Sequence, residues 1–145
     1  MTEKAIKIST DFRINRSPYL IILNDEDNEN GTVFLRQLKS FFPDILCQVL
    51  TPGSSRHKIT TKDNTFVIFA IFSETKAWKG SSAKWLIKKI VHFRNKADLL
   101  ISFGNPYLFD TISKDDNITK IISYWDSDSA QIAVAKILAD KKIIY

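Results

Sequence analysis

The sequence is poor in the residues that several common classes of protein depend on. It has one cysteine, Cys47, which excludes an internal disulfide and a multi-thiolate zinc site. Four glycines and four prolines are too few for a fibrous or low-complexity chain. No apolar run approaches the roughly 20 residues of a membrane-spanning helix, and the charged start of the chain lacks the apolar core of a secretory signal. We therefore expect a soluble, cytoplasmic protein with one domain over residues 1–145.

The excess of positive charge is small. There are 21 Lys and Arg against 16 Asp and Glu, a formal net charge of +5. Lys84, Lys88, His92 and Lys96 recur at near-helical spacing, which is one requirement of a nucleic-acid surface. The same spacing is typical of the solvated face of an amphipathic helix. A basic module associated with nucleic acid is therefore the weakest of the alternatives.

What the chain does contain is a series of short apolar runs, most of them continuous rather than alternating. Continuous runs are typical of strands that are buried on both faces, as in parallel sheets covered by helices. The segment Ala5–Ser9 alternates instead, and could be an edge strand or a lead-in to the domain. The five predicted strands are Tyr19–Leu23, Cys47–Leu50, Phe66–Phe72, Leu99–Phe103 and Lys120–Trp125, with Phe66–Phe72 and Leu99–Phe103 near the centre of the sheet.

Helical patterns separate these strands. We predict helices over Thr32–Phe42, Ser81–Ala97 and Ser127–Asp140, the last capped by Asp126 or Ser127, and a short helix that begins at Pro106. Strands that alternate with helices form βαβ units with right-handed crossovers. The predicted fold class is therefore α/β: a flavodoxin-like three-layer sandwich around a mainly parallel sheet of five or six strands.

The candidate functional residues lie where the predicted strands end. In an open parallel sheet, ligands bind beyond the carboxyl ends of the strands. Glu74 is the only acid in the segment that directly follows the central strand, and the tryptophans near strand ends could either face a ligand or complete the edge of the core. The residues that we expect to face a ligand or partner are Glu74, Trp78, Lys79, Gly104, Asn105, Trp125 and Asp126.

Common catalytic, metal and cofactor motifs are absent from the sequence. It has no phosphate-binding loop with two spaced glycines, no GxGxxG and no GxSxG. The acidic segment Asn24–Asp27 could hold Mg²⁺ in a phosphate-accepting receiver domain. However, the central strand ends in Phe72, Ser73 and Glu74, without the acceptor aspartate that such a domain needs. We predict no catalytic residues, no metal and no cofactor.

The most specific stretch of the sequence is Leu99–Tyr107, which reads LLISFGNPY. A strand, a glycine turn at Gly104 and a proline-opened helix in this order resemble the hallmark of the C-terminal α/β-sandwich domain of family 3 glycoside hydrolases, of the β-N-acetylglucosaminidase type. The segments Phe69–Ser82 and Tyr124–Leu138 resemble two further parts of that domain, in order and spacing. The resemblance covers about residues 66–140, and extends to the first half of the chain only in general layout.

This resemblance implies a domain that accompanies a catalytic (β/α)₈ barrel, in cis or in trans. In the family the barrel carries the nucleophile and the acid/base pair, and no position of this chain matches either motif. We therefore expect an accessory domain of a β-N-acetylhexosaminidase-type enzyme that supports the barrel or binds a partner or carbohydrate, with no activity of its own. A free-standing flavodoxin-like binding or regulatory domain remains the alternative.

Overall fold

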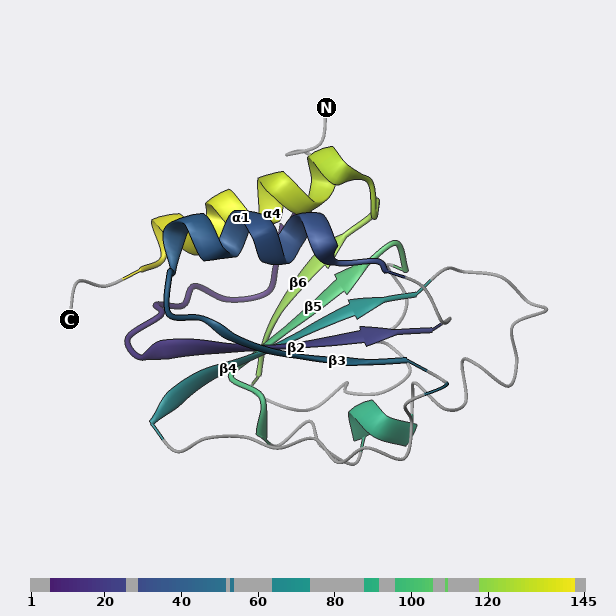
Figure 1. Ribbon diagram of the computed structural model, residues 1–145, viewed down its shortest axis with the longest axis horizontal. Coiled ribbons are helices and arrows are strands. Elements are labelled where there is room, and N and C mark those ends of the chain that lie inside the picture. The colour runs from purple at the N-terminus through teal and green to yellow at the C-terminus, as the bar shows by residue number, and fades with distance from the viewer. Residues whose placement is uncertain are drawn as a thin grey trace.

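The computed structural model describes residues 6–25, 29–51, 53, 64–73, 88–91, 96–105, 109 and 118–142. Within these residues the strands form one six-stranded sheet in the order β1-β6-β5-β4-β2-β3 (Figure 1). All neighbouring strands are parallel except β1, which is antiparallel to β6. The mainly parallel sheet with two central apolar strands is thus confirmed. The strands are β1 (Ile6–Ile8), β2 (Ser17–Asn24), β3 (Leu46–Leu50), β4 (Thr65–Phe72), β5 (Leu99–Phe103) and β6 (Thr119–Ser123).

Two strands, β2 and β6, differ from the sequence-based expectation by more than one residue at one end. Strand β2 is longer than predicted because it pairs with β4 over its whole length, from Ser17 opposite Thr65 to Asn24 opposite Phe72. Strand β6 is shorter and ends at Ser123 instead of Trp125. The Ser123 hydroxyl donates a hydrogen bond to the Trp125 carbonyl at 2.7 Å, which turns the chain out of the sheet.

Helices α1 (Thr32–Phe41) and α4 (Asp128–Asp140) lie side by side on one face of the sheet (Figure 1). Both were predicted within one residue of their ends, and Ser127 is the N-cap of α4, where its hydroxyl accepts a hydrogen bond from the Ala130 amide. The core beneath them is aromatic. Phe103 stacks on Phe72 with ring centroids 4.5 Å apart and meets Phe34 of α1 edge-on at 5.2 Å.

The opposite face of the sheet is buried as well, which makes the fold a three-layer α/β sandwich. Ile90, in a helical segment over residues 88–91, is fully buried among strand side chains that include Phe69 and Leu100. Phe109 belongs to the same apolar cluster, and it is the described residue of the short helix predicted from Pro106. The rest of that short helix lies outside the described residues.

The predicted helix Ser81–Ala97 is described only in part. Residues 88–91 are helical, as expected, whereas Ala97 is not. Asp98 already holds the start of β4: its amide donates to the Val67 carbonyl at 2.8 Å, and its carboxylate accepts from the Val67 amide at 2.9 Å. Because Asp98 is already hydrogen-bonded to β4, the helix has to end before Ala97.

Candidate functional site

The carboxyl ends of β2, β4, β5 and β6 meet at one edge of the sheet, because these strands are parallel (Figure 1). We call this the carboxyl edge; its described residues are Asn24, Asp25, Ser73, Gly104, Asn105, Tyr124, Trp125 and Asp126. Each strand end is tied to the next by a backbone hydrogen bond. The amides of Asp25, Ser73 and Gly104 donate to the carbonyls of Phe72, Phe103 and Ser123 at 3.1, 3.3 and 3.0 Å. The carboxyl edge is therefore a continuous, fixed surface.

Buried polar side chains gather at or next to the carboxyl edge. Those of the described part of the chain are Asn24, Asp25, Ser73, Ser102, Ser123 and Gln131. Two of them hold the turns that leave the strands, since Ser102 donates to the Asn105 carbonyl and Ser123 to the Trp125 carbonyl, both at 2.7 Å. Internal hydrogen bonds offset the cost of burying polar groups. The buried hydroxyls thus fix the exits of β5 and β6.

Gly104 permits the close packing of three of these segments. Its backbone has a φ of 88°, a conformation that side chains disfavour. A β-carbon at this position would lie 3.0 Å from the Ser73 carbonyl oxygen and 3.6 Å from the β-carbon of Asp126. The structure therefore brings Gly104, Ser73 and Asp126 together at one edge, as the sequence predicts for the ends of parallel strands.

Trp125 and Asp126 form the most exposed part of the carboxyl edge. The Trp125 residue is 62% exposed, the highest value among the exposed large apolar residues of the described part. Asp126 is half-buried, and within the residues that the structure describes its carboxylate has no hydrogen-bond or ion-pair partner. Its carbonyl accepts a hydrogen bond from the side-chain amide of Gln131 at 2.9 Å. An exposed indole and a free carboxylate thus follow each other on a fixed turn.

Sequence analysis predicted no buried hydrogen-bonding role for two polar residues of this region. Gln131 interrupts the apolar stripe of α4 that continues through Val134, Ala135 and Leu138, and that interruption was an available signal of a buried role. Asn24 ends the buried strand β2, and its side-chain Nδ2 donates to the Asn30 carbonyl at 3.2 Å. Its Oδ1 is fully buried and has no hydrogen-bond partner.

The other predicted site residues are placed only in part. Asn105 lies half-buried at the carboxyl edge, next to Gly104. Glu74, Trp78 and Lys79 lie outside the described residues, so their predicted role stays a prediction. Of the basic helix face, Lys88 and Lys96 are described and exposed.

No group of three or more His, Cys, Asp or Glu side chains is placed to hold a metal ion in residues 6–25, 29–51, 53, 64–73, 88–91, 96–105, 109 and 118–142. In the same ranges, no helix has the length and apolar character that crossing a membrane requires.

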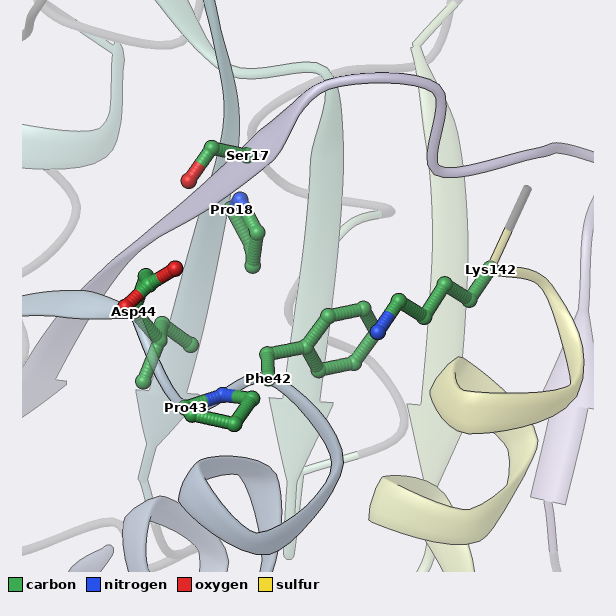
Figure 2. A pocket seen from close by; sticks show the side chains of 7 residues that line it. Ser17, Pro18, Phe42, Pro43, Asp44 and Lys142 are labelled. Carbon is green, nitrogen blue, oxygen red and sulfur yellow. The ribbon is translucent and has the colours of Figure 1, made fainter. Parts of the chain in front are cut away.

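A cavity of about 330 Å³ lies at the opposite end of the sheet, where β2 begins (Figure 2). Lys142 reaches across it: its Nζ donates to the Phe41 carbonyl at 3.2 Å and lies 5.2 Å from the centre of the Phe42 ring. The Lys142 ammonium thus closes the carboxyl end of α1, where carbonyls lack helical partners. The cavity does not include any of the predicted site residues. Its lining residues are Ser17, Pro18, Phe42, Pro43, Asp44, Ile45 and Lys142.

Solved structures share this fold although no family model and no curated protein matches the sequence. A family 3 β-N-acetylglucosaminidase from Paenibacillus sp. str. FPU-7 superposes with a TM-score of 0.64 at 17% identity, over 99% of this chain and 30% of that protein. The β-glucoside phosphorylase BglX gives 0.60 at 13% identity, over 97% of this chain and 28% of that protein. A fungal multi-domain family 3 β-N-acetylglucosaminidase gives 0.59 at 11% identity, over 97% of this chain and 17% of that protein.

These likenesses define the class of domain. The protein is an α/β sandwich that spans under a third of the length of the proteins it superposes on. Its fold is that of the C-terminal domain of family 3 glycoside hydrolases, which confirms at the level of the fold the resemblance of the LLISFGNPY segment. In fold, the chain therefore corresponds to one part of a larger enzyme.

Proposed function

We propose that this chain, as a single domain over residues 1–145, is a non-catalytic domain that supports a family 3 catalytic barrel of the β-N-acetylhexosaminidase type, in cis or in trans. One observation carries the proposal: 99% of the chain superposes on 30% of a family 3 β-N-acetylglucosaminidase. A chain that matches one part of an enzyme so completely is best explained as the counterpart of that part.

The carboxyl edge itself argues for a supporting role. Glycoside hydrolysis needs two carboxyl groups about 5–9 Å apart, on either side of one sugar ring. The described acids of this edge are Asp25, after β2, and Asp126, after β6, and β5 and β4 lie between those strands. Three strand spacings of about 4.8 Å put these two chain positions about 14 Å apart. This pair is too widely spaced for either the retaining or the inverting mechanism.

The experiment is a reconstitution. The native reading frame and its neighbours are first inspected for a family 3 barrel, and the purified chain is then mixed with that barrel expressed without its own sandwich domain. We expect a one-to-one complex by light scattering and a higher melting temperature of the barrel, because a partner that binds only the folded state stabilises it. A barrel from an unrelated glycosidase family is the control. If the family 3 barrel neither binds nor gains stability, the free-standing binding or regulatory domain is the better explanation.

A further inference from the structure

We propose that the cavity at the start of β2 binds a small zwitterion whose ammonium and carboxylate groups are separated by an apolar chain, as in an ω-amino acid. The ligand's ammonium pairs with Asp44, its chain lies along the apolar wall of the cavity, and its carboxylate pairs with Lys142. The cavity lies at the end of the sheet opposite the carboxyl edge, so the proposal does not depend on the support of a barrel.

The first argument is that the cavity carries two opposite charges that do not neutralise each other. Of its described lining residues, only Asp44 and Lys142 are charged. Figure 2 shows them on different sides of the cavity, Asp44 in the turn after α1 and Lys142 reaching in from the end of α4. Within the part of the chain that the structure describes, neither side chain forms an ion pair, with the other or with any third residue. The cavity therefore offers one anionic and one cationic contact at separate places.

The second argument is that the Lys142 ammonium is held in position but keeps its charge. Its Nζ donates one hydrogen bond, to the Phe41 carbonyl at 3.2 Å, and lies 5.2 Å from the centre of the Phe42 ring. An ammonium has three donors, and neither a carbonyl nor an aromatic ring carries a full negative charge that would cancel its own. Lys142 can therefore donate a charge-assisted hydrogen bond to a carboxylate.

The third argument is the apolar wall between the two charges. Apart from Ser17, Asp44 and Lys142, the described lining residues are Pro18, Phe42, Pro43 and Ile45. The side chains of these four residues take methylene groups out of water, which strengthens binding in proportion to the apolar area covered. A volume of about 330 Å³ is at the lower end of the range for small-molecule sites, so the cavity fits a short chain.

The backbone on both sides of the cavity is already ordered. The turn that carries Asp44 is closed by a hydrogen bond from the Ile45 amide to the Phe42 carbonyl at 3.0 Å. On the other side, the Lys142 amide donates to the Ala139 carbonyl at 3.2 Å. A preorganised site loses less conformational freedom on binding than a flexible one.

These contacts select against ligands that carry a single charge. A carboxylic acid is attracted by Lys142 and repelled by Asp44, and an alkylamine meets the reverse. An ω-amino acid carries both charges at opposite ends of a methylene chain. It therefore satisfies Asp44, the apolar wall and Lys142 at the same time.

The test is an NMR titration of the full chain with ε-aminocaproate, caproate and hexylamine. The amides of Ser17, Ile45 and Lys142 should shift in a saturable way with ε-aminocaproate, with a Kd on the order of 1 mM. Caproate and hexylamine should bind at least tenfold more weakly, because each lacks one of the two charges. The amides of Gly104 and Asp126, at the carboxyl edge, are internal controls. Absence of saturable shifts with ε-aminocaproate, or equal affinity for all three compounds, overturns the proposal.

A fourth compound, Nα-acetyllysine, identifies the source of the zwitterion. It presents the same two charges as a lysine at the carboxyl end of a peptide. Tighter binding of Nα-acetyllysine than of ε-aminocaproate supports the proposal with a peptide end as the source, and the reverse order supports it with a free ω-amino acid.

Variants separate the two contacts. Asp44→Asn and Lys142→Met should each weaken binding of ε-aminocaproate about tenfold. Asp44→Asn should also strengthen binding of caproate, and Lys142→Met that of hexylamine, because each substitution removes the charge that repels that ligand. A merely structural defect would weaken binding of all three compounds. Lys136→Met, on the exposed side of α4, is the matched control and should leave the affinities unchanged.

Thermal melts verify that each variant is folded. Unchanged affinity for ε-aminocaproate in a folded Asp44→Asn protein contradicts the proposal, whether or not the barrel reconstitution succeeds.

Discussion

The side chain of Gln131 in α4 caps helix α1 at Phe34, 97 residues away in the sequence: its Oε1 accepts a hydrogen bond from the Phe34 amide at 2.9 Å. Phe34 is the third residue of α1, where the amide has no partner within the helix. An N-cap side chain usually accepts this hydrogen bond, but the N-cap of α1 is Gly31, which has none. Gln131 supplies that acceptor from the neighbouring helix and, through Nε2, also holds the Asp126 carbonyl.

Gln131→Met should therefore lower the free energy of unfolding by about 1–3 kcal/mol, because it leaves the buried Phe34 amide without an acceptor. Urea denaturation measures the loss. Lys136→Met, on the exposed side of the same helix, should change stability by no more than about 0.5 kcal/mol. Equal effects of the two substitutions would show that Gln131 does not act as a cap.

Gly104→Ala should destabilise the protein by about 1–3 kcal/mol, since the positive φ and the contact with the Ser73 carbonyl both oppose a β-carbon. Gly31→Ala is the matched comparison. Its φ is also positive, at 98°, but the atoms that its β-carbon would meet belong to the side chains of Ile22 and Phe72 and not to the backbone. Chemical denaturation should show the larger loss for Gly104→Ala, and the reverse order would contradict this account of the glycine turn.

The Cys47 thiol should react slowly while the protein is folded. Burial raises its pKa from 9.0 to about 11, an effect that the nearby Lys39 opposes only in part. At pH 8 the reactive thiolate is then about 100-fold scarcer than in the unfolded chain. Alkylation should be correspondingly slower in native protein than in urea, and should accelerate about tenfold per pH unit up to about pH 11. Equal rates in the two states would contradict the burial of this thiol.

The same raised pKa predicts a pH dependence of stability. A thiol whose pKa is higher in the folded state stabilises the fold below pH 9 and loses that contribution as the pH rises from 9 to about 11. Melting temperatures measured across this range should fall less steeply in Cys47→Ala than in the parent protein. Parallel curves for the two proteins would show that Cys47 contributes nothing to the loss.

The chain alone should not hydrolyse β-N-acetylglucosaminides. The measurement is an assay of purified protein on a chromogenic N-acetylglucosaminide. Glu74→Gln is the critical variant, because Glu74 is the acid expected after the central strand. Turnover that survives repurification and is lost in Glu74→Gln would establish a catalytic carboxylate in this chain.

The sequence predicted those features of the fold that depend on local patterns. Phe66–Phe72 and Leu99–Phe103 are continuously apolar because both faces of β4 and β5 are covered, and this placed them at the centre of the sheet. The common edge of Gly104 and Asp126 follows from parallel strands. These inferences need only the period of the apolar residues and the direction of the strands.

Contacts between distant segments could not be predicted in this way. The hydrogen bond from the Phe34 amide to Gln131 joins two helices that are far apart in the sequence. Nothing in the pattern around Phe34 indicates which residue supplies the acceptor for this amide. The cavity at the start of β2 combines Ser17, Phe42 and Lys142 in the same manner. Such sites form when distant segments pack together, whereas the spacing of apolar residues indicates the structure of only the segment in which it occurs.

The antiparallel direction of β1 determines where a fused domain would attach. Ile6 pairs with Ser123, so the start of β1 lies at the carboxyl edge, whereas Lys142 borders the cavity at the other end of the sheet. A flexible linker of about ten residues ahead of Ile6 reaches roughly 17 Å and gives an attached domain a millimolar effective concentration near Trp125 and Asp126. The same domain attached after Lys142 begins at the far end of the strands. Whether the domain is attached before Ile6 or after Lys142 thus decides whether its weak contact with the carboxyl edge becomes intramolecular.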